Sequence, residues 1–138
     1  MTPPELIEGD LISTAPFVDA YLVLVGLMVG SFINLAADRV PRRESVISPP
    51  SHCRSCGRRL NSLDLLPVAG YLLRRGRCAS CGVRIGVGAP VVEAVSGTLM
   101  VLAVVWLGPW PGAAVGLALI ALWGLGVTGV ALQRPKAR

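Results

Sequence analysis

The sequence predicts an all-α integral membrane protein with three transmembrane helices and a cytoplasmic, zinc-ribbon-like loop of four cysteines between helices 1 and 2. Three observations predict this fold class. Hydrophobic residues make up 53% of the 138 residues and charged residues only 15%, whereas about a quarter of a soluble domain is charged. The apolar residues gather in three runs, 17–37, 90–108 and 113–132. All four cysteines lie between the first two runs.

Each apolar run is long enough to cross a bilayer. At about 1.5 Å of rise per residue, about 20 residues span about 30 Å, which is the thickness of the hydrocarbon core. A soluble bundle of three buried helices is the alternative, but too little polar sequence remains to cover such a core. We therefore interpret the three runs as transmembrane helices.

The remaining segments follow from this assignment. Residues 1–16 are expected to form a polar leader outside the cytoplasm, and the first span (17–37) contains Gly26-x-x-x-Gly30, a spacing that allows close helix contact. Pro90 suits the first turn of the second span (90–108). The stretch from Gly108 to Gly112 predicts a tight turn before the third span (113–132), and residues 133–138 form a tail.

The charges predict the orientation. Ten of the 13 lysines and arginines fall in the loop 38–89 and the other three end the chain, while the flank before the first span is acidic. By the positive-inside rule, the loop and the tail are cytoplasmic and the N-terminus is outside. The acidic start also argues against a cleaved signal peptide. The net charge of +5 fits topology and anionic lipid headgroups better than nucleic acid, because no aromatic residues interleave with the arginines.

The cysteines form two copies of one phrase, Cys53-x-x-Cys56-Gly57 and Cys78-x-x-Cys81-Gly82. Two such pairs can surround a tetrahedral zinc ion, although the 21-residue spacer is slightly longer than usual. Disulfide or redox pairs and four free thiols are the alternatives, and a reducing cytoplasm counts against stable disulfides. Four protein ligands leave no open position, so we predict structural zinc. His52 is interpreted as a neighbour of the site, not a ligand.

Several further motifs in collinear order resemble the type IV prepilin leader peptidase/N-methyltransferase family. They are Gly30-Ser31-Phe32-Ile33-Asn34-Leu35-x-x-x-Arg39-Val40-Pro41, Asp64-Leu65-Leu66-Pro67, Arg75-Gly76-Arg77-Cys78 and Pro90-Val91-Val92-Glu93. The sequence departs from the family at Gly88-Ala89, where Arg-Tyr is usual. The resemblance implies a bacterial cytoplasmic (inner) membrane protein. The family cleaves the leader from type IV prepilins or pseudopilins, the latter in type II secretion, and then methylates the new N-terminus with S-adenosylmethionine.

The family's two catalytic aspartates lie in later segments, and this sequence has no acidic residue after Glu93. We therefore expect no aspartyl peptidase activity from this chain on its own, and we do not interpret Asp38 and Glu93 as a substitute pair. The resemblance predicts an N-terminal module that partners a separate aspartyl peptidase subunit in prepilin processing. The alternative is a non-catalytic membrane assembly or regulatory factor with a structural zinc site.

Methyl transfer with S-adenosylmethionine is the enzymatic contribution that the resemblance implies for this module. The sequence itself has no glycine-rich phosphate loop to support cofactor binding. The family-like positions available for a methyl-transfer or substrate site each have a structural interpretation as well, in helix contact, interhelical hydrogen bonding or capping. They are Gly30, Asn34, Arg39, Asp64, Gly76 and Glu93.

Overall fold

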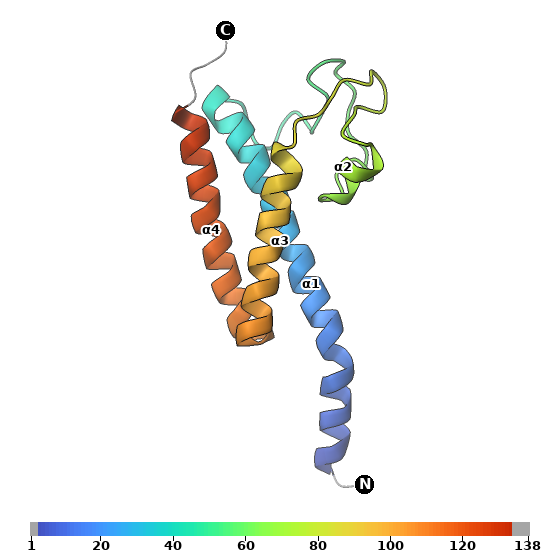
Figure 1. Ribbon diagram of the computed structural model, residues 1–138, viewed down its shortest axis with the longest axis vertical. Helices are drawn as coiled ribbons and strands as arrows, with labels where there is room; N and C mark the ends of the chain where they lie inside the picture. The colour runs from blue at the N-terminus through green and yellow to red at the C-terminus, as the bar shows by residue number, and fades with distance from the viewer. Residues whose placement is uncertain (1–2, 134–138) are drawn as a thin grey trace.

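The computed structural model describes residues 3–133 of the chain, so the tail predicted beyond 133 lies outside the described residues. The elements in order are α1 (Pro3–Arg39), the 3-10 turn η1 (Val40–Arg42), α2 (Ala69–Leu73), α3 (Gly88–Leu107) and α4 (Pro109–Gln133). The described residues form no strand beyond two isolated bridges within the loop. The predicted helical fold, with three candidate membrane spans and a cysteine cluster between the first two, is confirmed (Figure 1).

Three segments are long and apolar enough to cross a membrane: Pro16–Arg42, Gly88–Leu107 and Pro109–Gln133. Large apolar side chains stay exposed on their outer faces, such as Val105 and Trp106, at 74% and 81%. A lipid environment removes the cost of that exposure. The chain is therefore a membrane protein.

The helix bounds extend beyond the predicted spans. α1 is already helical from Pro3, and α4 begins at Pro109, where the sequence predicted a start at 113. Pro109 and Pro111 fit the first turn of a helix, because the N–H groups there have no partner within the helix. Gly108 alone makes the turn between α3 and α4, with a φ of +79° that favours glycine.

The Gly26-x-x-x-Gly30 spacing of α1 faces α3. A Cβ atom at Gly26 would lie 2.8 Å from the Met100 Cβ, and one at Gly30 would lie 2.7 Å from the Ser96 Oγ. Only glycine allows this approach, as expected for close-packed membrane helices. Met100 and Ile120 are fully buried where the three helices meet.

The ends of the helices determine where the loop sits. The end of α1, the start of α3 and the end of α4 lie at one end of the bundle, and the turn between α3 and α4 lies at the opposite end (Figure 1). The loop between α1 and α3 extends from the first of these ends, with α2 beside the first turns of α3. The candidate site lies in this loop and beneath it.

Candidate metal centre and adjoining cavity

The two cysteine phrases fold into the same turn, which we call a knuckle. In each, the N–H of the first cysteine donates to the carbonyl oxygen five residues later, and the N–H of the glycine donates back to the first cysteine. The four distances are 2.8 Å for Cys53 to Arg58, 2.8 Å for Gly57 to Cys53, 2.9 Å for Cys78 to Val83 and 3.0 Å for Gly82 to Cys78. Both glycines have a positive φ, +73° and +67°, which side chains disfavour.

The knuckles bring all four cysteines into one cluster. Their Sγ atoms lie within 4.8 Å of one another, and the thiols are free. Two of the S···S contacts run between knuckles, at 3.9 Å for Cys53 to Cys81 and for Cys56 to Cys78. A tetrahedron with Zn–S bonds of about 2.3 Å has S···S edges of about 3.8 Å. The cluster therefore fits a tetrahedral metal ion, which would join the two knuckles.

The thiols differ in acidity. The backbone N–H groups of Cys81 and Ser80 lower the pKa of Cys78 to about 6. The backbone N–H of Arg58 favours the thiolate of Cys56, but desolvation and the neighbouring thiols together raise the pKa of Cys56 to about 11. Thiolates are the form that binds metal. Of these two thiols Cys78 ionises more readily, and a divalent cation would remove the repulsion that opposes further ionisation.

Arg54 links the first knuckle to the end of α1. Its guanidinium pairs with Asp38, in the last turn of α1, and its Nη2 lies 3.0 Å from the Oε2 of Glu44. The hydrogen bond from Arg54 lowers the pKa of Glu44. These side chains are about half exposed, so the pairs orient the knuckle more than they stabilise it.

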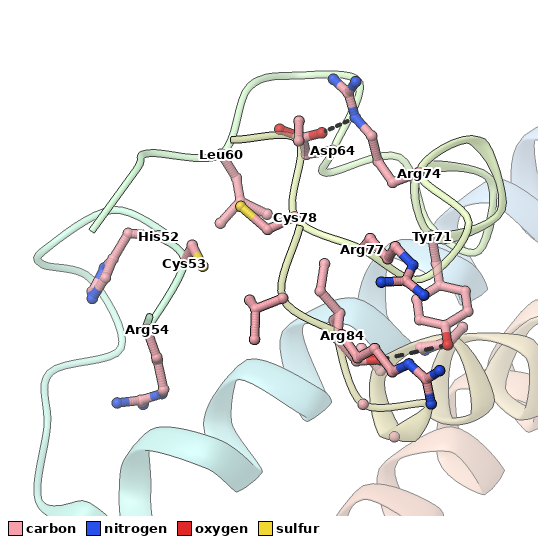
Figure 2. Close-up of a pocket in the computed structure, with 18 of the residues that line it drawn as sticks. His52, Cys53, Arg54, Leu60, Asp64, Tyr71, Arg74, Arg77, Cys78 and Arg84 are labelled. Atoms are coloured by element: carbon pink, nitrogen blue, oxygen red, sulfur yellow. Dashed lines mark hydrogen bonds and ion pairs between the residues drawn. The ribbon is translucent and has the colours of Figure 1, made fainter. Parts of the chain in front are cut away.

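Asp64 links the first knuckle to α2. Its side chain is only 6% exposed and accepts hydrogen bonds from Arg58 Nη2 at 2.8 Å and Arg74 Nε at 2.6 Å; Figure 2 shows the second of these. Burial favours the neutral acid, but the hydrogen bonds from Arg74, the Asn61 N–H and Arg58 together lower the pKa of Asp64. The carboxylate is therefore an ionised, buried connection between two parts of the loop.

Glu93 links the loop to the membrane helices. It lies in the second turn of α3, is buried, and accepts a hydrogen bond of 2.6 Å from the backbone N–H of Val68. Val68 has a φ of +57°, which a β-branched residue adopts only when its surroundings impose it. The carboxylate of Glu93 thus fixes the residue that precedes α2.

A cavity of about 560 Å³ lies between the cysteine cluster and the helix ends. Three of the six candidate positions line it: Asn34, Asp64 and Glu93. Figure 2 shows that the side chains of Tyr71, Arg77 and Arg84 gather at one side of it. Arginines, an aromatic ring and carboxylates stand in a lining that is otherwise mainly apolar, so the cavity suits a ligand that has both charged and apolar parts.

A second cavity, of about 620 Å³, lies among α1, α3 and α4. Asn34 and Asp38 line both cavities, so the end of α1 separates the space under the cysteine cluster from the space between the helices.

The other three candidate positions support the structure around the first cavity. Gly30 packs on α3, and the buried Arg39 donates a hydrogen bond of 2.6 Å from its Nη1 to the Ser45 carbonyl. Gly76 has a φ of +66°, and a Cβ there would lie 2.7 Å from the hydroxyl of Tyr71.

Arg54 and Tyr71 are among the residues of the cavity wall that sequence reasoning missed, whereas His52, interpreted from the sequence as a neighbour of the metal site, also lines the cavity. The Nδ1 of His52 lies 2.9 Å from the Pro50 carbonyl oxygen, and this histidine is not part of the metal-binding group. Arg54 and Asp38, 16 residues apart, carry no periodic signal in the sequence, so their pairing could not be predicted.

Comparison with known proteins bears on this site. Residues 24–107 match the family model described as the Bacterial Peptidase A24 N-terminal domain. The prepilin leader peptidase/N-methyltransferase of Myxococcus xanthus (strain DK1622) is 40% identical over 84 residues, which are 61% of this chain and 25% of that protein. The protein of the same name from Bacillus subtilis (strain 168) is 39% identical over 82 residues, 59% of this chain and 33% of that protein.

The relative from Neisseria gonorrhoeae, also a prepilin leader peptidase/N-methyltransferase, is 30% identical over 126 residues, 74% of this chain and 44% of that protein. The chain thus spans between a quarter and less than half the length of these relatives. No solved structure matches it. The matched residues include both knuckles and the candidate positions from Gly30 to Glu93. The chain therefore belongs to the bacterial A24 peptidase N-terminal domain family.

Proposed function

We propose that this chain is the N-terminal membrane module of a prepilin-processing system, which acts with a separate aspartyl peptidase subunit in the cleavage and N-methylation of type IV prepilins or pseudopilins. The observation that carries the proposal is the arginine-bearing cavity beneath the cysteine cluster, at one membrane face, in a domain of this family. The excess of arginine in the loop supports a cytoplasmic location in the inner membrane, with the N-terminus outside.

In this proposal the cysteine cluster, Cys53, Cys56, Cys78 and Cys81, holds structural zinc. The S···S distances support this assignment. Bound zinc would supply a fixed junction between the two knuckles, so that the arginines on both sides of the cavity keep their positions. The ion takes no part in bond cleavage, because four thiolates complete its coordination.

The methyl-transfer contribution of the module is also proposed for this cavity, with S-adenosylmethionine as donor. Asn34, Asp64 and Glu93 belong to its wall, while Gly30, Arg39 and Gly76 support the wall. The amide of Asn34 and the hydroxyl of Tyr71 are its neutral hydrogen-bonding groups at the helix ends, and arginines supply positive charge for an anionic group of the ligand or substrate.

The acidic side chains support the need for a partner. Among the described residues from Asp38 onward, Asp38, Glu44 and Asp64 pair with arginines, and Glu93 accepts the Val68 N–H. An aspartyl peptidase needs two carboxylates placed to activate water. Since these four are engaged elsewhere, we propose that the cleaving pair belongs to the partner subunit.

This engagement of the acids also favours a second candidate function, a non-catalytic membrane assembly or regulatory factor. One experiment distinguishes the two candidate functions. The chain is pulled down from native membranes together with its bound proteins, and the recovered material is incubated with prepilin and labelled S-adenosylmethionine. The first proposal expects an aspartyl peptidase chain in the pull-down, trimming only in its presence, and label on the mature pilin. Recovery of pilus or secretion assembly proteins without peptidase, and without label, would favour the second.

The cavity assignment has its own test within that assay. Asn34→Ala should lower the rate of label transfer without loss of bound metal, whereas Val105→Ala, on the lipid-facing side of α3, should leave the rate unchanged. Equal rates for both variants and the wild type would place methyl transfer outside this cavity.

The metal is tested separately. Purified protein should hold about one zinc per chain by elemental analysis, because four thiolates complete one tetrahedral site. The double change Cys53→Ser and Cys78→Ser, which removes one ligand from each knuckle, should abolish this binding. Ser55→Ala and Ser80→Ala alter neighbouring positions of the same turns and should retain it. Full zinc content in the double cysteine variant would contradict the site.

A further inference from the structure

One surface of the loop has no role in the site described above. It consists of four exposed leucines, Leu63, Leu65, Leu72 and Leu73, which we call the leucine patch. Their exposed fractions are 56%, 47%, 66% and 67%. We propose that the leucine patch inserts into the membrane leaflet on the loop side of the bundle, so that α2 anchors the cysteine cluster to the lipid surface.

The patch is built on a fixed scaffold. α2 packs against the stretch that precedes it, since a Cβ at the buried Gly70 would lie 2.7 Å from the Leu63 carbonyl oxygen and 2.8 Å from that of Asp64. The two leucine-bearing stretches, 63–65 and 72–73, therefore belong to one packed unit. Its inner side is occupied by Gly70 and the buried Pro67, so the exposed leucines are not available to the interior of the loop.

The height of this unit along the bundle is set by Glu93. α3 has 20 residues and is about 30 Å long, so its whole length is needed to cross a hydrocarbon core of about 30 Å. Glu93 lies five residues after the start of α3, about 7.5 Å along its axis. Because its carboxylate accepts the N–H of Val68, the start of α2 lies at or just inside the plane where α3 enters the hydrocarbon.

The ribbon agrees with this placement. Figure 1 draws α2 at the height of the first turns of α3, while the outer part of the loop lies farther out, beyond the start of α3. An exposed leucine at this height meets the boundary between headgroups and acyl chains. Apolar side chains at this boundary have a lower free energy against lipid chains than in water.

Charge complementarity favours a lipid surface as the occupant. The two acids of this part of the loop are turned inward, with Asp64 and Glu93 both more than 90% buried. Arg75, two residues after Leu73, is exposed, and within the residues whose side chains the structure describes it forms no ion pair. Leucines beside an unneutralised arginine suit an anionic leaflet, where a basic residue adds electrostatic attraction.

The test places a small fluorescent amino acid at position 72 of the full chain in lipid nanodiscs. Position 47 is the matched control, because Ile47 is an equally apolar, exposed loop residue outside the patch. Position 105, on the lipid-facing side of α3, is the positive reference. Quenching is measured with phospholipids brominated on the acyl chains and with aqueous iodide, and circular dichroism verifies that each variant is folded.

We expect bromine quenching at position 72 close to that at position 105 and several-fold above that at position 47, with iodide quenching in the opposite order. Quenching at position 72 that matches position 47 would overturn the proposal, because the patch would then face water. Protection from both quenchers would also overturn it, because protein would then cover the patch. The measurement needs neither prepilin nor peptidase, so it stands or falls independently of the proposed function.

Discussion

Replacing Gly30 with alanine should force α1 away from α3. A Cβ atom at this position would lie 2.7 Å from the Oγ of Ser96, 2.8 Å from the Cβ of Ser96 and 3.0 Å from the Cα of Glu93. Non-bonded carbon atoms prefer about 3.5–4.0 Å. The backbone atom of Glu93 cannot rotate away, so the helices must separate by about 0.5–1 Å at this crossing to restore ordinary contact.

The magnitude follows from a comparison with Gly126→Ala. A Cβ at Gly126 would meet nothing within 4 Å, so that variant gains up to about 1 kcal/mol from better helix propensity. Overpacking at Gly30 costs about 1–3 kcal/mol. Gly30→Ala gains the same helix propensity, so this contribution cancels between the two variants. The free energy of unfolding should therefore differ between them by about 1–3 kcal/mol, with Gly30→Ala the less stable.

The assay is the free energy of unfolding in bicelles, measured by steric trapping, with the wild type and both variants side by side. Adding Ser96→Gly to Gly30→Ala removes the two shortest contacts and should recover most of the loss, leaving only the contact with Glu93. Equal stability of the two alanine variants, or no recovery from the second change, would refute the close approach of α1 and α3 at this point.

Asp64→Asn should destabilise the loop by about 1–3 kcal/mol, because it removes the charge from a buried acceptor of two arginine hydrogen bonds. The measurement is hydrogen–deuterium exchange of the loop amides, which should become faster. Glu44→Gln, in an exposed ion pair, should increase this exchange less. The pKa of Asp64 is lowered from its usual 3.8, so its contribution is present above that value and is lost as the pH falls below it. The difference in exchange between wild type and Asp64→Asn should therefore shrink as the pH falls below about 4, and a constant difference would contradict an ionised Asp64. Gly82→Ala should destabilise its knuckle by about 1–2 kcal/mol because of its positive φ, whereas Gly86→Ala, with open space around it, should be neutral. The measurement is the zinc affinity of each variant. Equal affinities of the two variants would count against the knuckle geometry.

The features that sequence predicted are those with a local signal. A long apolar run specifies a membrane span wherever it occurs, and paired cysteines with a glycine after each pair specify a knuckle with little help from the rest of the chain. Helix contact through Gly26 and Gly30 followed from their spacing on one face. The early start of α4 was missed because Pro109 and Pro111 fit a turn and the first turn of a helix equally well.

The connections within the loop carry no such signal. The loop between α1 and α3 is rich in arginine, and nothing in the order of these residues indicates that Arg58 and Arg74 share Asp64. Nor does a valine suggest a positive φ, so the strained backbone of Val68 and its hydrogen bond with Glu93 emerge only from the packed structure. These contacts depend on how α2 rests against α3, which a pattern of residue types does not encode.

The hydrogen bond between Val68 and Glu93 has a consequence for biogenesis. Glu93 follows Val68 by 25 residues, so the loop leaves the ribosome before the carboxylate that fixes it has been synthesised. The loop can reach its final arrangement only after α3 has entered the bilayer beside α1. Insertion of the helices therefore precedes the final placement of α2, and a chain stalled before α3 would leave Val68 without the acceptor of its N–H.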